Sequence, residues 1–265
     1  MADTGFAAAE DIARVFVDAR RARRAITTYP GPAPQNMTDA YAVQDTAIRY
    51  DGRPVGGWKL GRINPPHLER LGANRLAGPI FTDQIVAAPG GAEVPMAIFA
   101  DGFGAAEAEF LLRIGTAPDP AKSDYTIATA TPLIDAIHAG IEVASSPYPA
   151  INIDGPPVTA SDYGNNNGLV VGDAIDADEG GIARMDVQLL INGAVIGQAR
   201  AADMLDGPFG AAAFLFNLAA TRGIALAPGQ WISSGAVTGV HPVKAGDRVE
   251  ALFDGRRPVR CTITA

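Results

Sequence analysis

Two glutamates that lie one residue apart are the side chains of this sequence best placed for chemistry. Glu107 and Glu109 alternate with Ala108 and Phe110, so in a β-strand the two carboxylates project from one face and the apolar side chains from the other. Like charges held side by side repel each other, which favours a cation between them. Taken alone, such a pair is more often two solvated side chains on an edge strand.

A third carboxylate, Glu142, lies within the apolar run 141–144. An ionised carboxylate in a buried strand is costly unless it is paired or bound to a metal. Few partners are near in the sequence, because Lys122 is the only lysine or arginine between Arg113 and Arg184. Carboxylate oxygens are the ligands of hard cations, so we expect the three glutamates to bind Mg²⁺ or Mn²⁺ with positions left for water and substrate.

Lys59 and Asp83 are further candidates, each with a plainer alternative. Lys59 stands alone in the glycine-flanked run 56–61, where it could neutralise a substrate carboxylate or transfer a proton. Its ammonium could also simply reach the surface. Asp83 follows the short apolar run 80–82, a place where an acid is more often a turn cap than a catalytic group.

Composition argues against several classes of protein. The 265 residues carry 29 acidic and 21 basic side chains, a net charge of −8, which disfavours a nucleic-acid or membrane partner. A hydrophobic content of 48% predicts a folded core. Cys261 is the single cysteine and alternates with apolar side chains, which predicts a buried thiol. Acidic residues near the N-terminus and the lack of a long apolar stretch lead us to expect a cytoplasmic protein.

The sequence pattern divides the chain into a helical lobe and a β-rich region. Helical spacing of apolar residues over 12–19 predicts a first helix, whose basic end from Arg20 to Arg24 we expect to face solvent. Thr38 can cap a second helix with Tyr50 facing inward and Gly52 as its end. We therefore expect a lobe over residues 1–52 and a catalytic domain over residues 53–265.

Within the β-rich region, two helices and two hairpins are well marked. Pro132 and Gly140 bound a predicted helix that runs directly into the strand of Glu142, and a second helix is predicted over 207–223. The hairpins turn on Asn192-Gly193 and Asp254-Gly255.

Taken in order, these segments resemble the fumarylacetoacetate hydrolase superfamily, in particular its branch of 2-oxopent-4-enoate (2-keto-4-pentenoate) hydratases and 4-oxalocrotonate decarboxylases. The resemblance covers nearly the whole chain and rests on Gly57-Trp58-Lys59-Leu60-Gly61, Ile80-Phe81-Thr82-Asp83, Glu107-Ala108-Glu109, Gly140-Ile141-Glu142-Val143, Ser234-Gly235-Ala236 and Val243-Lys244-Ala245-Gly246-Asp247. It implies an α+β fold, a β-rich mixed sandwich or roll with a small N-terminal helical lobe.

The resemblance also implies roles for individual residues. It makes Glu107, Glu109 and Glu142 the metal ligands, Lys59 an active-site lysine oriented by Asp83, and Leu60, Asn167, Ser234 and Gly235 substrate-binding residues. Two segments near the expected substrate depart from the branch: Arg62-Ile63-Asn64, where Leu-Thr is usual, and the run 162–168, where hydratases carry an Asp-Asn-Ala-Ser type of segment.

The function that the resemblance implies is metal-dependent hydration of a 2-hydroxy-2,4-dienoate to a 4-hydroxy-2-oxo acid, as in aromatic meta-cleavage catabolism. Decarboxylation of the 4-oxalocrotonate type, hydrolysis of an acylpyruvate and a non-catalytic oligomeric partner subunit are the alternatives. A hydrolase usually needs a His–Glu pair; His67 and Glu69 are two residues apart, and we expect His67 to lie on a surface turn. We also expect a homo-oligomer.

Overall fold

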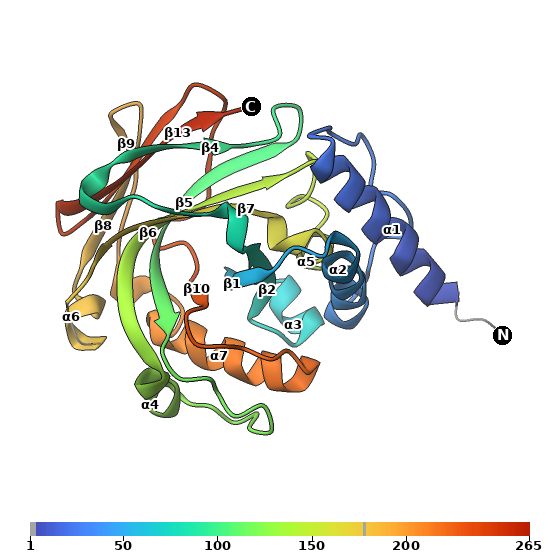
Figure 1. Cartoon of the computed structure of the whole chain (residues 1–265), viewed down its shortest axis with the longest axis horizontal. Helices are drawn as coiled ribbons and strands as arrows, with labels where there is room; N and C mark the ends of the chain where they lie inside the picture. Colours follow the sequence, from blue (N-terminus) through green and yellow to red (C-terminus); the bar gives the residue numbers. More distant parts are fainter. Residues whose placement is uncertain (1–3, 177–178) are drawn as a thin grey trace.

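The computed structural model describes residues 4–176 and 179–265 (Figure 1). Its α-helices are α1 (Thr4–Arg21), α2 (Met37–Asp51), α3 (His67–Leu71), α4 (Ile127–Ala130), α5 (Pro156–Ser161), α6 (Glu179–Ala183) and α7 (Gly207–Arg222). Its strands are β1 (Val55–Arg62), β2 (Arg75–Phe81), β3 (Ile85–Ala87), β4 (Glu93–Ala97), β5 (Phe103–Ile114), β6 (Ile134–Ser146), β7 (Asn166–Ala174), β8 (Asp186–Ile191), β9 (Ala194–Arg200), β10 (Trp231–Ser233), β11 (His241–Pro242), β12 (Arg248–Phe253) and β13 (Arg256–Thr264).

The strands of the described residues form two sheets. The larger has the order β2-β1-β10-β5-β6-β7-β3, with β11 pairing to β5, and the smaller has the order β4-β13-β12-β8-β9. Figure 1 shows β8, β9 and β13 on one side of the molecule, α1 and α2 on the other, and the long curved strands β5 and β6 between them. The mixed α+β architecture expected from the sequence is confirmed.

The two helices predicted for the N-terminal lobe are present and pack against each other. Phe16 of α1 and Val43 of α2 belong to one buried cluster. Asn36, not Thr38, caps α2, because its side chain accepts a hydrogen bond from a backbone N–H in the first turn. Tyr50 is 43% exposed rather than facing inward. α2 ends at Asp51, next to the predicted lobe boundary.

The prediction of a helix between Pro132 and Gly140 is wrong. Pro132 belongs to a 3₁₀ turn, and the residues after it form β6, which pairs with β5 on one side and β7 on the other. Hydrogen bonding along both edges outweighs a local helical pattern in these residues. Gly140 serves close packing rather than a helix end, since a Cβ at this position would lie 2.3 Å from Cδ1 of Leu111 on β5.

The apolar faces of the two sheets share one core. Phe110 of the larger sheet and Phe253 of the smaller meet edge to face, with ring centroids 5.2 Å apart. Cys261 is fully buried, and burial raises the pKa of its thiol to about 12, so the predicted buried thiol is confirmed. Both predicted hairpins and the predicted helix α7 are also present. Among the described residues, no helix has both the length and the apolar character to cross a bilayer.

Candidate functional site

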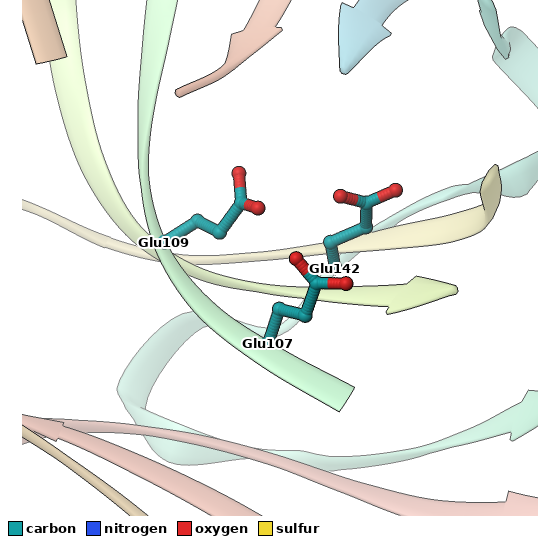
Figure 2. A group of neighbouring side chains, drawn as sticks. All are labelled: Glu107, Glu109 and Glu142. Carbon is teal, nitrogen blue, oxygen red and sulfur yellow. The ribbon is translucent and has the colours of Figure 1, made fainter. Parts of the chain in front are cut away.

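The three glutamates converge on one point inside the larger sheet. Glu107 and Glu142 stand directly opposite each other in the antiparallel pairing of β5 and β6, and Glu109 lies two residues further along β5. One carboxylate oxygen of each lies within 4.8 Å of the others, and Figure 2 shows the three side chains pointing toward one another. Because residues two apart share a face and opposed residues are close neighbours, the sheet register alone produces this cluster.

Neighbouring groups hold the outer oxygens of the cluster. Ser233 Oγ donates a hydrogen bond to Glu109 Oε2 at 2.5 Å, and the backbone N–H of Gly235 donates to the same oxygen at 2.9 Å. Asn166 Nδ2 donates to Glu142 Oε1 at 2.9 Å. The remaining oxygens, Glu109 Oε1 and Glu142 Oε2, are buried and accept no hydrogen bond from the described residues. Each of these two glutamates therefore has one oxygen held by hydrogen bonds and one oxygen without a hydrogen bond that could bind a cation.

Lys59 of β1 is the cation beside the cluster. Its side chain is 4% exposed, and Nζ lies 3.3 Å from Glu142 Oε2 in an ion pair. Nζ also donates a hydrogen bond to Asn165 Oδ1 at 3.3 Å. The lysine thus does not snorkel to the surface, and it is buried together with the carboxylates.

Burial and crowding shift the pKa of the site's groups. Burial raises the pKa of Glu107 to about 7, although Lys59 opposes the rise. Burial, followed by the charges of Glu142 and Glu107, raises the pKa of Glu109 well above its usual range. Burial alone would lower the pKa of Lys59, but the carboxylates, Glu142 first, outweigh it and the pKa is raised. The charged lysine is therefore strongly favoured, whereas full ionisation of the glutamates is not.

The donor set fits a hard divalent cation. Three ionised carboxylates and one ammonium carry a net charge of −2, which a divalent ion would neutralise. Two buried carboxylate oxygens lack a hydrogen-bond partner among the described residues, and metal coordination would satisfy both. All-oxygen donors suit Mg²⁺ or Mn²⁺ better than zinc.

Metal affinity should depend on pH in a definite direction. Cations bind the ionised carboxylates, and the pKa of Glu107 near 7 means that protons compete for this ligand in the metal-free protein. We expect the affinity for Mn²⁺ to rise from about pH 6 to about pH 8, by up to about tenfold per pH unit for each proton displaced. Titration calorimetry at both pH values measures it. An affinity that stays constant or falls with rising pH would contradict the assignment.

A cavity of about 640 Å³ opens onto this cluster. Lys59 and Glu107 line it, together with three of the four residues expected at the substrate, Leu60, Ser234 and Gly235. The turn at Gly235 packs closely on β1, since a Cβ on this residue would lie 3.2 Å from the backbone oxygen of Leu60. The cavity is therefore lined by one candidate metal ligand, by the lysine and by most of the predicted substrate contacts.

Asp83 and Asn167 do not lie where the resemblance places them. The side chain of Asp83 is 60% exposed and ion-paired with Arg53 at 3.3 Å. Asn167 Nδ2 donates to the backbone oxygen of Ala97, and its Oδ1 accepts from Arg20. Both residues line a separate cavity of about 340 Å³. Among the described residues, Asp83 therefore has no hydrogen bond or ion pair through which to orient Lys59.

Two residues of the site were missed from the sequence. Asn165 and Asn166, not Asn167, make the hydrogen bonds to Lys59 and Glu142. The three consecutive asparagines directly before an apolar strand could have indicated that polar side chains reach the site. The sequence pattern did not indicate which of the three points inward. His67 is also placed differently from the expected surface turn, since it begins α3, is half-buried and lines the cavity.

Comparison with known proteins gives similar structures only. No protein-family model and no curated protein sequence matches the chain. The 4-oxalocrotonate decarboxylase from Pseudomonas putida G7, solved with calcium and acetate, superposes with a TM-score of 0.79 at 20% identity, over 96% of this chain and 96% of that chain. Its complex with magnesium and adipate gives 0.79 at 20% identity, over 96% and 97%. Fumarylpyruvate hydrolase from Pseudomonas aeruginosa, in complex with Mn²⁺ and pyruvate, gives 0.58 at 14% identity, over 78% and 88%. At these identities the comparisons establish the fold, and the fold implied by the sequence resemblance is confirmed.

Proposed function

We propose that this chain, which has the fold of the fumarylacetoacetate hydrolase superfamily, is a divalent-metal-dependent enzyme that acts on a 2-oxo acid. The observation that carries the proposal is the buried cluster of Glu107, Glu109 and Glu142 beside Lys59. These glutamates would hold Mg²⁺ or Mn²⁺, which supplies a Lewis acid for the carboxylate and 2-oxygen of the substrate. Structures of the same fold were solved with calcium, magnesium or Mn²⁺.

The chain's own residues would bind the substrate and move its proton. The pKa of Lys59 is raised, so the ammonium is present at neutral pH to attract an anionic substrate into the cavity. Asn165 fixes the direction of the Nζ–H groups. Ser234 Oγ is buried, lines the cavity and has no hydrogen-bond partner among the described residues, which leaves it free to donate to a substrate oxygen.

For the reaction itself we propose hydration of a 2-hydroxy-2,4-dienoate. The dienol takes a proton at C5, and water then adds at C4 of the resulting enone to give a 4-hydroxy-2-oxo acid. Lys59 is the proton carrier that the cavity supplies beside the carboxylate cluster. The second candidate is decarboxylation, which the likeness to 4-oxalocrotonate decarboxylase over 96% of both chains favours.

Two arginines of the cavity suit a substrate with a second anionic group. Arg62 and Arg75 stand directly opposite each other in the pairing of β1 with β2, and both line the cavity. Arg75 is ion-paired with Asp206 at 3.2 Å, whereas Arg62 forms no hydrogen bond or ion pair with the described residues. An unpaired guanidinium beside a second cation favours an anion. A dicarboxylate dienoate and 4-oxalocrotonate both carry such a second anionic group, so these arginines favour a dicarboxylate substrate for either reaction.

The product mass separates the candidate reactions. The purified chain is incubated with 2-hydroxypenta-2,4-dienoate, a dienoate with a distal carboxylate, 4-oxalocrotonate and an acylpyruvate, with and without Mn²⁺. Hydration adds the mass of water, decarboxylation removes carbon dioxide, and hydrolysis yields two acids. Mn²⁺-dependent gain of water supports the proposal. Mn²⁺-dependent loss of carbon dioxide instead makes the chain a decarboxylase, and no turnover with any of the four contradicts the 2-oxo acid assignment.

Replacing Arg62 with alanine tests the second anionic group. We expect KM for the dienoate with a distal carboxylate to rise about tenfold, because one charged hydrogen bond is lost. KM for the monocarboxylate should stay within about twofold, and this substrate is the internal control. Steady-state kinetics on both substrates measures the difference. Equal changes in KM for the two substrates would count against a distal anion at Arg62.

The variant His67→Ala tests acylpyruvate hydrolysis. His67 lines the cavity, and a hydrolase needs a base that activates water. If the chain is a hydratase that uses Lys59, we expect His67→Ala to retain hydration within about threefold. Loss of acylpyruvate turnover in this variant, in a protein that hydrates no dienoate, would support the hydrolase instead.

A further inference from the structure

Arg20, at the end of α1, is buried rather than solvated. Its side chain is 5% exposed, and Nε and Nη2 donate to the two carboxylate oxygens of Asp162 at 2.6 and 2.8 Å. Asp162 is 1% exposed, so the pair forms a buried, bidentate salt bridge. The guanidinium also lies over the rings of Tyr163 and Phe99, 5.1 and 5.6 Å from their centroids.

The remaining donors of Arg20 join two strands of the larger sheet. Nη2 donates to the backbone oxygen of Ser145 at the end of β6, and Nη1 donates to that of Asn166 at the start of β7, both at 3.1 Å. Nη1 also donates to Asn167 Oδ1 at 3.2 Å. One side chain of the N-terminal lobe therefore fixes the connection between the strand of Glu142 and the strand that follows it.

This connection has a conformation that needs an external restraint. Tyr163, Gly164 and Asn165 have φ angles of 56°, 62° and 58°, three consecutive residues in the left-handed region. Residues other than glycine adopt this region at a cost and hold it only where the surrounding contacts require it. The salt bridge from Arg20 to Asp162 anchors the residue just before the left-handed run, and the bond to Asn166 anchors the residue just after it.

The restrained segment carries the two asparagines that contact the site. Asn165 Oδ1 accepts from Lys59 Nζ, and Asn166 Nδ2 donates to Glu142 Oε1. A rotation of the segment would release both bonds together, leaving Glu142 and Lys59 without these hydrogen bonds. Groups that orient metal ligands through hydrogen bonds typically change metal affinity by about 10–100-fold when they are removed.

We infer that Arg20 is a positioning residue of the metal site, which makes the N-terminal helix a structural part of that site. The inference rests on the proposed metal binding by the three glutamates. The forked guanidinium, and not merely a positive charge, sets the orientation of Glu142 through Asn166.

Three variants test the inference by Mn²⁺ affinity, measured by titration calorimetry. Arg20→Met removes the donors, and we expect the dissociation constant to rise at least about tenfold. Arg20→Lys keeps the charge without the fork, and we expect it to resemble Arg20→Met. Arg222→Met is the control, because Arg222 is also ion-paired, with Asp45 at 2.5 Å, but its hydrogen bonds and ion pair join α7 to α2 and involve neither the three glutamates nor residues 162–167. This control should lose stability and keep its Mn²⁺ affinity.

A readout on the metal-free protein tests the restraint of residues 162–167 without Mn²⁺. We expect amide hydrogen exchange over residues 162–167 to become faster in Arg20→Met and to stay unchanged in Arg222→Met. If the parent protein binds no Mn²⁺, the proposed function fails and the inference fails with it. If the parent binds Mn²⁺ and Arg20→Met binds it equally well, only the inference is overturned. An Arg20→Lys variant with full affinity would show that charge alone suffices, which also overturns it.

Discussion

The variant Glu142→Gln is expected to lose divalent-metal binding and to turn over substrate at least about a thousandfold more slowly, because a metal ligand contributes several kcal/mol to the transition state. Glutamine keeps the shape of the side chain, and its oxygen can still accept the hydrogen bond from Asn166. What it removes is the negative charge and the carboxylate oxygen Oε2, which accepts no hydrogen bond from the described residues. Titration with Mn²⁺ and kcat/KM for the preferred substrate measure the two losses.

Unfolding would not account for these losses. The charge of Glu142 raises the pKa of Glu109, so removing it relieves repulsion in the metal-free cluster. The substitution also removes the buried ion pair with Lys59 at 3.3 Å, so the two effects oppose each other and we expect the metal-free variant to melt close to the temperature of the parent protein. Glu250→Gln is a control in the smaller sheet, where Glu250 accepts a hydrogen bond from Arg260 of the neighbouring strand. This variant should retain Mn²⁺ binding and turnover. Full turnover in Glu142→Gln would remove this residue from the metal site.

The metal cluster could be predicted from the sequence because it depends on short-range periodicity. Alternation in a strand puts Glu107 and Glu109 on one face whatever the rest of the chain does. The position of Glu142 in an apolar run indicated burial, and burial of a carboxylate requires a partner. Both arguments need only a few consecutive residues, and the structure brings the three side chains together as expected.

The predictions that were wrong concern segments and side chains whose structure depends on residues far away in the sequence. The run from Pro132 to Gly140 has a helical pattern of apolar residues, yet pairing with two neighbouring strands makes it part of β6. Local propensity is a weak guide where a segment can be hydrogen-bonded along both edges. Arg20 was expected in solvent because its neighbours are basic, whereas its partner Asp162 lies 142 residues away. The periodicity of one helix contains no information about such a partner.

The choice among three consecutive asparagines failed for a related reason. Alternation predicts side-chain direction only in regular structure, and Tyr163, Gly164 and Asn165 are left-handed. The turn changes the phase with which β7 begins, so Asn165 and Asn166 reach the site and Asn167 points to the smaller cavity. The departures from the expected family segment drew attention to this region but did not indicate which of its side chains contact Lys59 and Glu142.

The variant Lys59→Met should separate metal binding from catalysis. Methionine fills a similar volume without charge, so the site would lose its ammonium and keep all three carboxylates. Because Lys59 opposes the cation electrostatically, we expect Mn²⁺ to bind Lys59→Met at least as tightly as the parent protein at about pH 8. Turnover should fall by about 10²–10⁴-fold, since the proton carrier and the positive charge facing the substrate are both lost.

The pH dependence of Mn²⁺ binding by Lys59→Met is a second, independent test of the role of the lysine. Lys59 lowers the pKa of Glu107, so its removal should raise this pKa above about 7 and move the onset of Mn²⁺ binding to higher pH. The exposed Lys122, paired with Asp124 on the surface, provides the control Lys122→Met, which should change neither property. If Lys59→Met lost Mn²⁺ binding at every pH together with turnover, the lysine would be a structural partner of Glu142 rather than the group that handles the substrate. Retained binding without turnover would place it in the chemistry, because the metal site would then be intact and still inactive.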